Sequence, residues 1–148
     1  MARERSYIFW LLARTDYSRK KLETKLRDRK TLSPEQIKDL LDKMEEQKYF
    51  QPAAFLRTRT RSLARKGYSA SGISYRLRED GVSESATSVG TMLDEQGIEA
   101  DAGLKAMVEK ARRKCADKKV PETFMRRCLT RGHRYADVLK AWKQSFEE

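Results

Sequence analysis

The sequence is poor in the residues that mark sheet proteins, disulfide scaffolds and metal sites. Its 148 residues include two Cys, three Pro, seven Gly and one His. Cys115 and Cys128 form no CxxC motif, and with His133 they fall short of the about four ligands of a structural zinc site. We therefore expect no metal or other cofactor, and two small buried thiols in a reducing, cytoplasmic environment.

Long apolar runs are also missing, which argues against secretion and membrane insertion. The run Tyr7–Ala13 has only the shortest length of a signal-peptide core, and no small-residue cleavage site follows it. This run is far too short to span a bilayer. No segment combines a basic face with a fully apolar one, as a helix lying on a membrane surface would. We expect no membrane contact.

No catalytic set is visible in the sequence. It contains neither a P-loop nor another Gly-rich phosphate loop. His133 has no obvious nucleophile as a partner, and the spacing of Ser69 and Ser83 explains them as helix caps. We therefore predict that the protein is not an enzyme.

Positive charge is what the chain has in excess. Lys and Arg number 33 against 22 Asp and Glu, which gives a net charge of +11. The excess is densest from Lys48 to Arg78, a stretch with eight basic and no acidic residues. A balance this basic implies an anionic partner, such as nucleic acid, an acidic protein surface or anionic lipid.

Apolar residues recur at helical spacing throughout the chain, and Ser, Pro and Gly separate the segments. The sequence Ser33-Pro34-Glu35-Gln36 has the order of a capping box with Pro at the first helical position. Helix starts are also predicted at Ser18, Ser69, Ser83 and Pro121, and helix stops at Gly67, Gly81, Gly97 and Gly132. These signals predict an all-α protein.

The helical segments repeat about every 50 residues. Apolar spacings of 5 and 4 recur in three triplets: Tyr17/Leu22/Leu26, Tyr68/Ile73/Leu77 and Val120/Met125/Leu129. Spacings of 3 and 4 recur in three more: Ile37/Leu40/Met44, Ala86/Val89/Leu93 and Tyr135/Val138/Trp142. We predict three tandem three-helix repeats, at residues 1–50, 51–98 and 99–148, in an elongated, curved array.

Three stretches resemble signatures of the RecX family of recombinase regulators, in the family's order and over nearly the whole chain. They are Tyr17-Ser18-Arg19-Lys20-Lys21-Leu22-Glu23-x-Lys25-Leu26, then Arg65-Lys66-Gly67-Tyr68-(x)4-Ile73-(x)3-Leu77-(x)3-Gly81-Val82, and Leu129-x-Arg131-Gly132-(x)5-Val138-(x)3-Trp142. Two positions depart from the family pattern. Pro52-Ala53-Ala54-Phe55 lacks the usual Asp before Phe, and His133 replaces an aromatic.

This resemblance implies a function and partners. Family members fold as tandem three-helix units, bind RecA or the RecA–DNA filament and commonly inhibit it, and some bind DNA directly. For this chain it implies a regulator, most simply an inhibitor, of recombinase ATPase and strand exchange in DNA repair and the SOS response. We expect a monomer that also contacts single- or double-stranded DNA weakly, through phosphates.

Basic side chains mark the expected binding face. Arg57, Arg61 and Arg65 recur every four residues and so form one stripe on a helix, where their mutual repulsion makes a purely structural role unfavourable. The full predicted set is Arg57, Arg59, Arg61, Arg65, Lys66, Arg76, Arg112, Arg113, Arg127 and Arg131. A further group in the first repeat is interspersed with acids and fits solvation and contact equally well: Arg19, Lys20, Lys21, Lys25, Arg27, Arg29 and Lys30.

Aromatic residues are expected to pack inside the repeats rather than to stack on bases. The positions concerned are Tyr7, Trp10, Tyr17, Tyr68 and Trp142.

A DNA-binding module of helix-turn-helix type is the alternative, since each unit has three short helices. Its candidate reading helices begin with short or acidic side chains, after Ser69 and Ser83, so we expect contact with phosphates without sequence reading.

Overall fold

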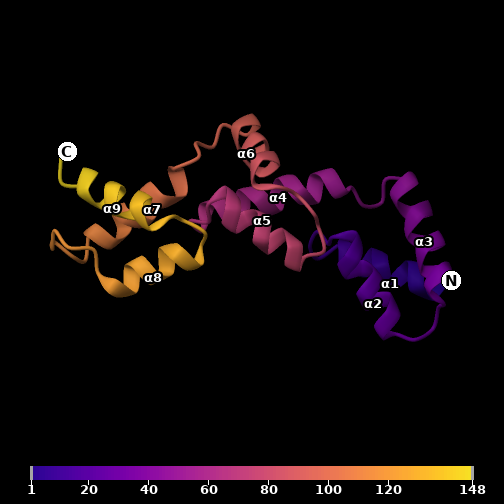
Figure 1. Ribbon diagram of the computed structural model, residues 1–148. Coiled ribbons are helices and arrows are strands. Elements are labelled where there is room, and N and C mark those ends of the chain that lie inside the picture. The colour runs from indigo at the N-terminus through magenta and orange to yellow at the C-terminus, as the bar shows by residue number, and fades with distance from the viewer. Residues whose placement is uncertain (1, 148) are drawn as a thin grey trace. The chain divides into compact units, whose positions relative to one another are not determined.

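The computed structural model describes residues 2–147, and within them the chain forms nine helices and no strand (Figure 1). The prediction of an all-α protein is therefore confirmed. The helices are α1 (Ala2–Leu12), α2 (Arg19–Asp28), α3 (Pro34–Glu46), α4 (Pro52–Arg65), α5 (Ala70–Glu79), α6 (Ala86–Glu95), α7 (Ala102–Arg112), α8 (Glu122–Thr130) and α9 (Tyr135–Gln144). Their grouping into three repeats and the elongated, curved array stay predictions.

Most of the predicted helix boundaries are present. The Ser18 side chain accepts a hydrogen bond from the Lys21 amide, and Ser33 with Gln36 forms a complete capping box. The Ser69 hydroxyl caps α5 by accepting from the Gly72 amide at 3.1 Å. The four glycines predicted as helix stops all have positive φ angles: Gly67, Gly81, Gly97 and Gly132.

Two predicted helix starts are displaced. Ser83 does not cap α6; the cap is Ser85, whose hydroxyl accepts from the Ser88 amide at 3.0 Å. The Ser74 hydroxyl donates to the Glu84 carbonyl at 2.5 Å, and this bond holds the segment between Ser83 and Ser85 outside the helix. Pro121 lies at the cap position of α8, one residue before the helix begins.

The chain divides into two compact units, each described by itself. The first consists of the residues up to Thr58 together with Glu79–Val82. Its core is apolar and is formed by Ile8, Leu11, Leu22, Leu26, Ile37, Leu40, Leu41, Met44 and Phe50. Here α2 packs against α3, and Ser18 donates to the Asp80 carbonyl at 2.7 Å.

The second unit consists of Arg59–Arg78 and the residues from Ser83 onward. In it α9 packs against α7 and α8 around a core of Leu104, Met107, Val108, Phe124, Met125, Cys128, Val138 and Trp142. Ile73 and Leu77 of α5 are fully buried, as the apolar spacing predicts. The repeat boundaries predicted after residues 50 and 98 stay predictions.

Three residues expected in the interior lie at the surface. Trp10 is 52% exposed because Ile8 and Leu11 occupy the buried side of α1. Leu129 is 44% exposed because the preceding residue, Cys128, takes the buried position. Tyr135 is 58% exposed at the first turn of α9.

The other expected aromatic positions are buried or partly buried. Trp142 is 1% exposed, whereas Tyr7, Tyr17 and Tyr68 are partly buried. Across residues 2–147, each helix is too short or too polar to cross a bilayer.

Candidate anion-binding site

Helix α4 carries the arginine stripe. Arg57, Arg61 and Arg65 are exposed, and Arg59 is partly buried. Arg57 belongs to the first compact unit, whereas the other three belong to the second. The Arg61 guanidinium donates from Nε to the Gln96 side-chain oxygen at 2.9 Å, so this side chain is oriented by the end of α6.

Two turns of the second unit interlock immediately after α4. The Ser69 amide donates to the Arg131 carbonyl at 3.0 Å, and the Ser69 hydroxyl donates to the Gly132 carbonyl at 2.8 Å. His133 is buried, and its Nε2 lies 2.5 Å from the Gly67 carbonyl oxygen. The residue that departs from the RecX pattern therefore joins the turn after α4 to the turn after α8. We call these contacts between residues 67–72 and residues 131–133 the glycine junction.

The two turns can approach so closely because glycine has no side chain. A Cβ on Gly72 would collide with the carbonyl group of Arg131, and a Cβ on Gly132 would lie 2.5 Å from the Gly72 nitrogen. A Cβ on Gly67 would lie 2.6 Å from the Met107 sulfur. Gly67 and Gly132 also have φ angles of +97° and +92°, which other residues rarely adopt. The junction therefore fixes the backbone from which its basic side chains extend.

The glycine junction assembles basic residues from distant parts of the sequence around one tyrosine. The guanidinium carbons of Arg76 and Arg131 lie 5.6 and 5.7 Å from the centre of the Tyr68 ring. Both distances fall within the range of cation–π attraction. Arg65 and Lys66 are exposed and directly precede Gly67. We call the set Arg65, Lys66, Tyr68, Arg76 and Arg131 the basic junction.

This arrangement suits the binding of carboxylates or phosphates. A guanidinium presents paired donors that match the oxygens of either group, and such charge-assisted hydrogen bonds are stronger than neutral ones. A guanidinium held against an aromatic ring is already partly ordered. Tyr68 therefore partly orders the guanidiniums of Arg76 and Arg131, beside the exposed charges of Arg65 and Lys66.

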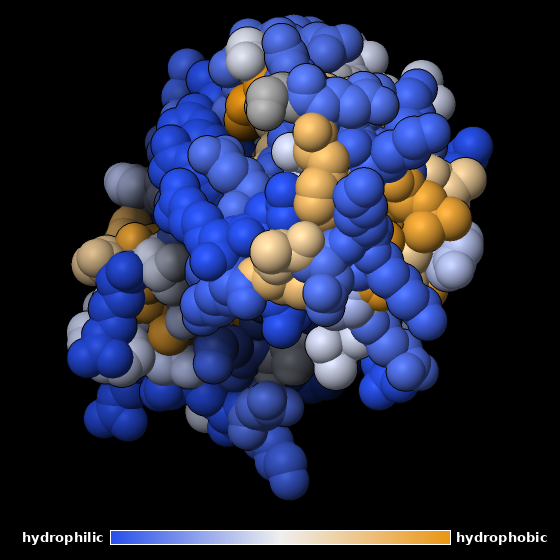
Figure 2. Space-filling view, turned by 90° about the vertical axis from the view of Figure 1, so that its left-hand side faces the viewer, coloured by the Kyte–Doolittle hydropathy of each residue, from blue (hydrophilic) through white to orange (hydrophobic). Residues whose placement is uncertain are grey.

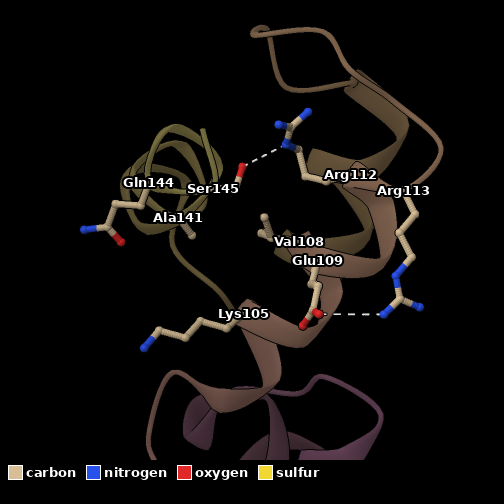
Figure 3. Close-up of a pocket in the computed structure, with 8 residues that line it drawn as sticks. All are labelled: Lys105, Val108, Glu109, Arg112, Arg113, Ala141, Gln144 and Ser145. Atoms are coloured by element: carbon tan, nitrogen blue, oxygen red, sulfur yellow. Dashed lines mark hydrogen bonds and ion pairs between the residues drawn. The ribbon is translucent and has the colours of Figure 1, made fainter. Parts of the chain in front are cut away.

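Arg112 and Arg113, which were also predicted to bind, lie elsewhere in the second unit (Figure 3). Arg112 donates to the Ser145 hydroxyl at 3.0 Å, and its guanidinium carbon lies 3.5 Å from the centre of the Phe146 ring. It therefore serves the packing of α7 against α9. Arg113 points away and pairs with Glu109 at 3.7 Å.

A hollow of about 460 Å³ lies beside Arg112 and Arg113. Its lining is Lys105, Val108, Glu109, Arg112, Arg113, Ala141, Gln144 and Ser145 (Figure 3). The mixture of charges gives it no clear preference for an anion. Arg127 is exposed on α8, one turn before Arg131.

Cys128 is an unreactive core residue. Burial raises the pKa of its thiol to about 11, against the opposing effect of Arg131 and Arg127. Cys115 is partly buried, and both thiols are free. Within residues 2–147, no three His, Cys, Asp or Glu side chains form a group that could hold a metal ion.

Part of the basic group in the first unit is bound to carboxylates. Arg19 donates to Glu45 at 2.9 Å and also pairs with Asp42 and Glu23. Hydrogen bonds from Arg19 and Lys38 lower the pKa of the Asp42 carboxyl. Arg19 thus joins α2 to α3 and is not available to a partner.

One side of the first turn of α5 is covered by another turn, whereas Ser71 is exposed. Both Ser69 and Gly72 contact the Arg131–Gly132 backbone, so the first turn of this helix is held within the second unit. A reading helix presents residues of its first turns to base edges. This observation disfavours α5 as a reading helix and leaves the basic junction as the best candidate site.

Sequence reasoning predicted Arg65, Lys66, Arg76 and Arg131 as binding residues, but not the contacts of Arg76 and Arg131 with Tyr68. It placed Tyr68 in the core, whereas the ring is partly buried and lies beside two guanidiniums. The Arg131-Gly132 pair was the available signal, since a glycine in a turn permits close backbone approach.

Most of the face in Figure 2 is hydrophilic, and hydrophobic side chains appear there only as scattered patches.

Comparisons with known proteins give no match. No protein-family model, no curated protein and no solved structure is similar to this chain.

Proposed function

We propose that the protein is a non-enzymatic regulator that binds a RecA-type recombinase filament and lowers its ATP hydrolysis and strand exchange. Two facts support the proposal. The three signatures in the sequence resemble those of the RecX family, and the second and third contribute Arg65, Lys66 and Arg131 to the basic junction. The single observation that carries the proposal is that the glycine junction unites the second and third of these signatures.

The second and third signatures each contain a basic residue followed by glycine, Lys66-Gly67 and Arg131-Gly132. Each contains a glycine with positive φ directly after or near a basic residue, and the two turns are hydrogen-bonded to each other. A junction needed only for folding would not require two arginines beside its partly buried Tyr68 ring. An acidic groove of a protein filament is a partner that this arrangement fits, because several fixed cations can pair with carboxylates at once.

The protein would inhibit the recombinase by occupying the groove of its filament. A protein lodged across neighbouring recombinase subunits would impede the subunit movements that accompany ATP hydrolysis and would restrict access of a second DNA strand. Contact with DNA itself would be through phosphates and would weaken steeply with salt. Non-sequence-specific DNA binding is the alternative function, and the same basic residues would carry it.

The test is ATP hydrolysis by a recombinase on single-stranded DNA, with two double variants compared. Arg65→Glu/Arg131→Glu reverses two charges of the basic junction but retains the backbone hydrogen bonds of Arg131. Lys118→Glu/Lys119→Glu makes the same change in net charge at exposed positions of the same unit. We expect the first variant to need at least about tenfold more protein for half-inhibition, which corresponds to about 1.4 kcal/mol.

The control variant should stay within about twofold of the wild type, because rim charges mainly affect encounter. Equal inhibition by the two variants would show that only net charge matters and would remove the basic junction as the site. An unchanged rate with a several-fold excess of wild-type protein over filament subunits would remove the proposed function itself.

A further inference from the structure

The first compact unit carries a partly exposed layer of aromatic rings and guanidiniums that the proposed function does not use. The Tyr7 and Trp10 rings are stacked, with centroids 6.2 Å apart and planes inclined by 18°. The Arg14 guanidinium carbon lies 4.1 Å from the Trp10 ring centre, and that of Arg29 lies 4.2 Å from the Tyr7 ring centre. We call these four side chains the Tyr7–Trp10 face.

The helix positions explain why this face is exposed. Tyr7 and Trp10 are three residues apart and lie on one side of α1, whereas Ile8 and Leu11 are directed into the core. Trp10 is 52% exposed, and Arg14 and Arg29 are exposed. Packing of the unit does not explain why the large Trp10 ring is left half in water beside a guanidinium.

We propose that the Tyr7–Trp10 face binds single-stranded nucleic acid by stacking bases on the two rings and holding phosphates with Arg14 and Arg29. Nearly parallel rings offer flat surfaces to successive bases, and stacking of this kind tolerates any sequence. The charge is also suitable. The one acidic residue of α1 is Glu4, which is 7% exposed.

A base can replace a guanidinium on either ring. A cation over an exposed aromatic ring contributes about two- to fivefold to an equilibrium constant. Stacking of a base on such a ring contributes roughly five- to 150-fold in Kd. The exchange is therefore favourable, and the released guanidinium of Arg14 or Arg29 becomes available to the adjacent phosphate.

Other occupants fit the face less well. Protein–protein interfaces are also enriched in Tyr, Trp and Arg, but they do not require two nearly parallel rings with a guanidinium on each, as stacked bases and their phosphates do. A lipid surface would require an apolar face that inserts between headgroups, but Ile8 and Leu11 of α1 are already buried in the unit. Nucleic acid is the occupant that uses both the rings and the cations.

The experiment compares a short oligothymidylate with a fully abasic oligomer of equal length, and follows tryptophan fluorescence. We expect the oligothymidylate to quench Trp10 and to bind at least about fivefold more tightly than the abasic oligomer. Trp10→Ala should lose most of this difference, because only the partly buried Tyr7 ring then remains for stacking. Trp10→Phe leaves Trp142, which is 1% exposed, as the sole tryptophan, so quenching should disappear.

Two further variants serve as controls. Tyr135→Ala removes a 58% exposed ring of the second unit and should not change binding of either oligomer. Arg14→Gln should weaken both oligomers and reduce the log–log salt slope by about 0.7, the contribution of one phosphate on a single strand. Because this variant retains Trp10, it tests the face even if Trp10→Ala does not fold.

Equal affinity of the wild type for the two oligomers would overturn the proposal, since it would show attraction to phosphates alone. Quenching or a spectral shift with phosphatidylcholine–phosphatidylglycerol vesicles, without an effect of oligothymidylate, would also overturn it in favour of a lipid surface. No recombinase is present in this experiment, so its failure leaves the proposed function intact.

Discussion

Replacement of Gly72 by Ala tests whether the glycine junction is as tight as the structure shows. In an ordinary helix this change stabilises the folded state by about 1 kcal/mol, because Ala has the higher helix propensity. At Gly72 of α5, however, the new Cβ would collide with the Arg131 carbonyl group, which is backbone and cannot rotate away. We therefore expect the opposite sign.

The magnitude follows from the contacts that must shift. Overpacking of a tight contact costs roughly 1–3 kcal/mol. Separation of the two turns also weakens the hydrogen bonds from Ser69 to Arg131 and Gly132, each worth about 1 kcal/mol. After subtraction of the gain in helix propensity, we expect Gly72→Ala to lower the free energy of unfolding by about 1–3 kcal/mol.

Gly90→Ala in α6 is the matched control. A Cβ at Gly90 has no atom within 4 Å, so this variant should gain about 0.5–1 kcal/mol. Urea unfolding followed by circular dichroism and by Trp142 fluorescence measures both changes. If Gly72→Ala were as stabilising as Gly90→Ala, the junction would not be closely packed, and the positions of Arg76 and Arg131 would have no rigid support.

Two further predictions concern reactivity and charge. Cys115 should react with a thiol reagent in the native protein well before Cys128, whose raised pKa keeps its thiol protonated up to about pH 11; equal rates would contradict the burial of Cys128. Replacement of Arg57, Arg61 and Arg65 by Glu should leave the melting temperature nearly unchanged, because all three are exposed, and should reduce recombinase inhibition at least about tenfold. Normal melting with full inhibition would make the stripe a solvated surface only.

Features set by a few neighbouring residues were predictable from the sequence. The cap at Ser18, the capping box at Ser33 and the stop at Gly67 each depend on side-chain or backbone chemistry within one helical turn. The buried positions of α3 followed from spacing alone, because that helix has one strongly apolar side.

Features set by distant contacts were not predictable. Ser83 and Ser85 are equivalent as local signals, and the bond from Ser74 to the Glu84 carbonyl favours the later start. Cys128 and Leu129 are both apolar, so spacing could not decide which one faces the core. A shift by one residue rotates a helical side chain by about 100°.

The candidate site likewise combines a feature that the local sequence predicts with one that depends on distant contacts. The basic composition of Lys48–Arg78 predicted an anion-binding face, which stays a prediction; three residues of this stretch, Arg65, Lys66 and Arg76, belong to the basic junction together with Arg131. The meeting of Arg76 and Arg131 at one ring requires the hydrogen bonds between Ser69 and the Arg131–Gly132 turn, which join residues 62 and 63 positions apart. Helical spacing contains no information about a contact of that length.

The most direct test of the central claim adds wild-type protein to a recombinase filament whose single-stranded DNA is already fully covered, and follows ATP hydrolysis. Contact with the recombinase itself predicts a decrease in rate that persists when bare competitor DNA is present. An unchanged rate on the covered filament, together with binding to the bare DNA, would contradict the claim and would identify the protein as a DNA-binding protein that does not regulate the recombinase.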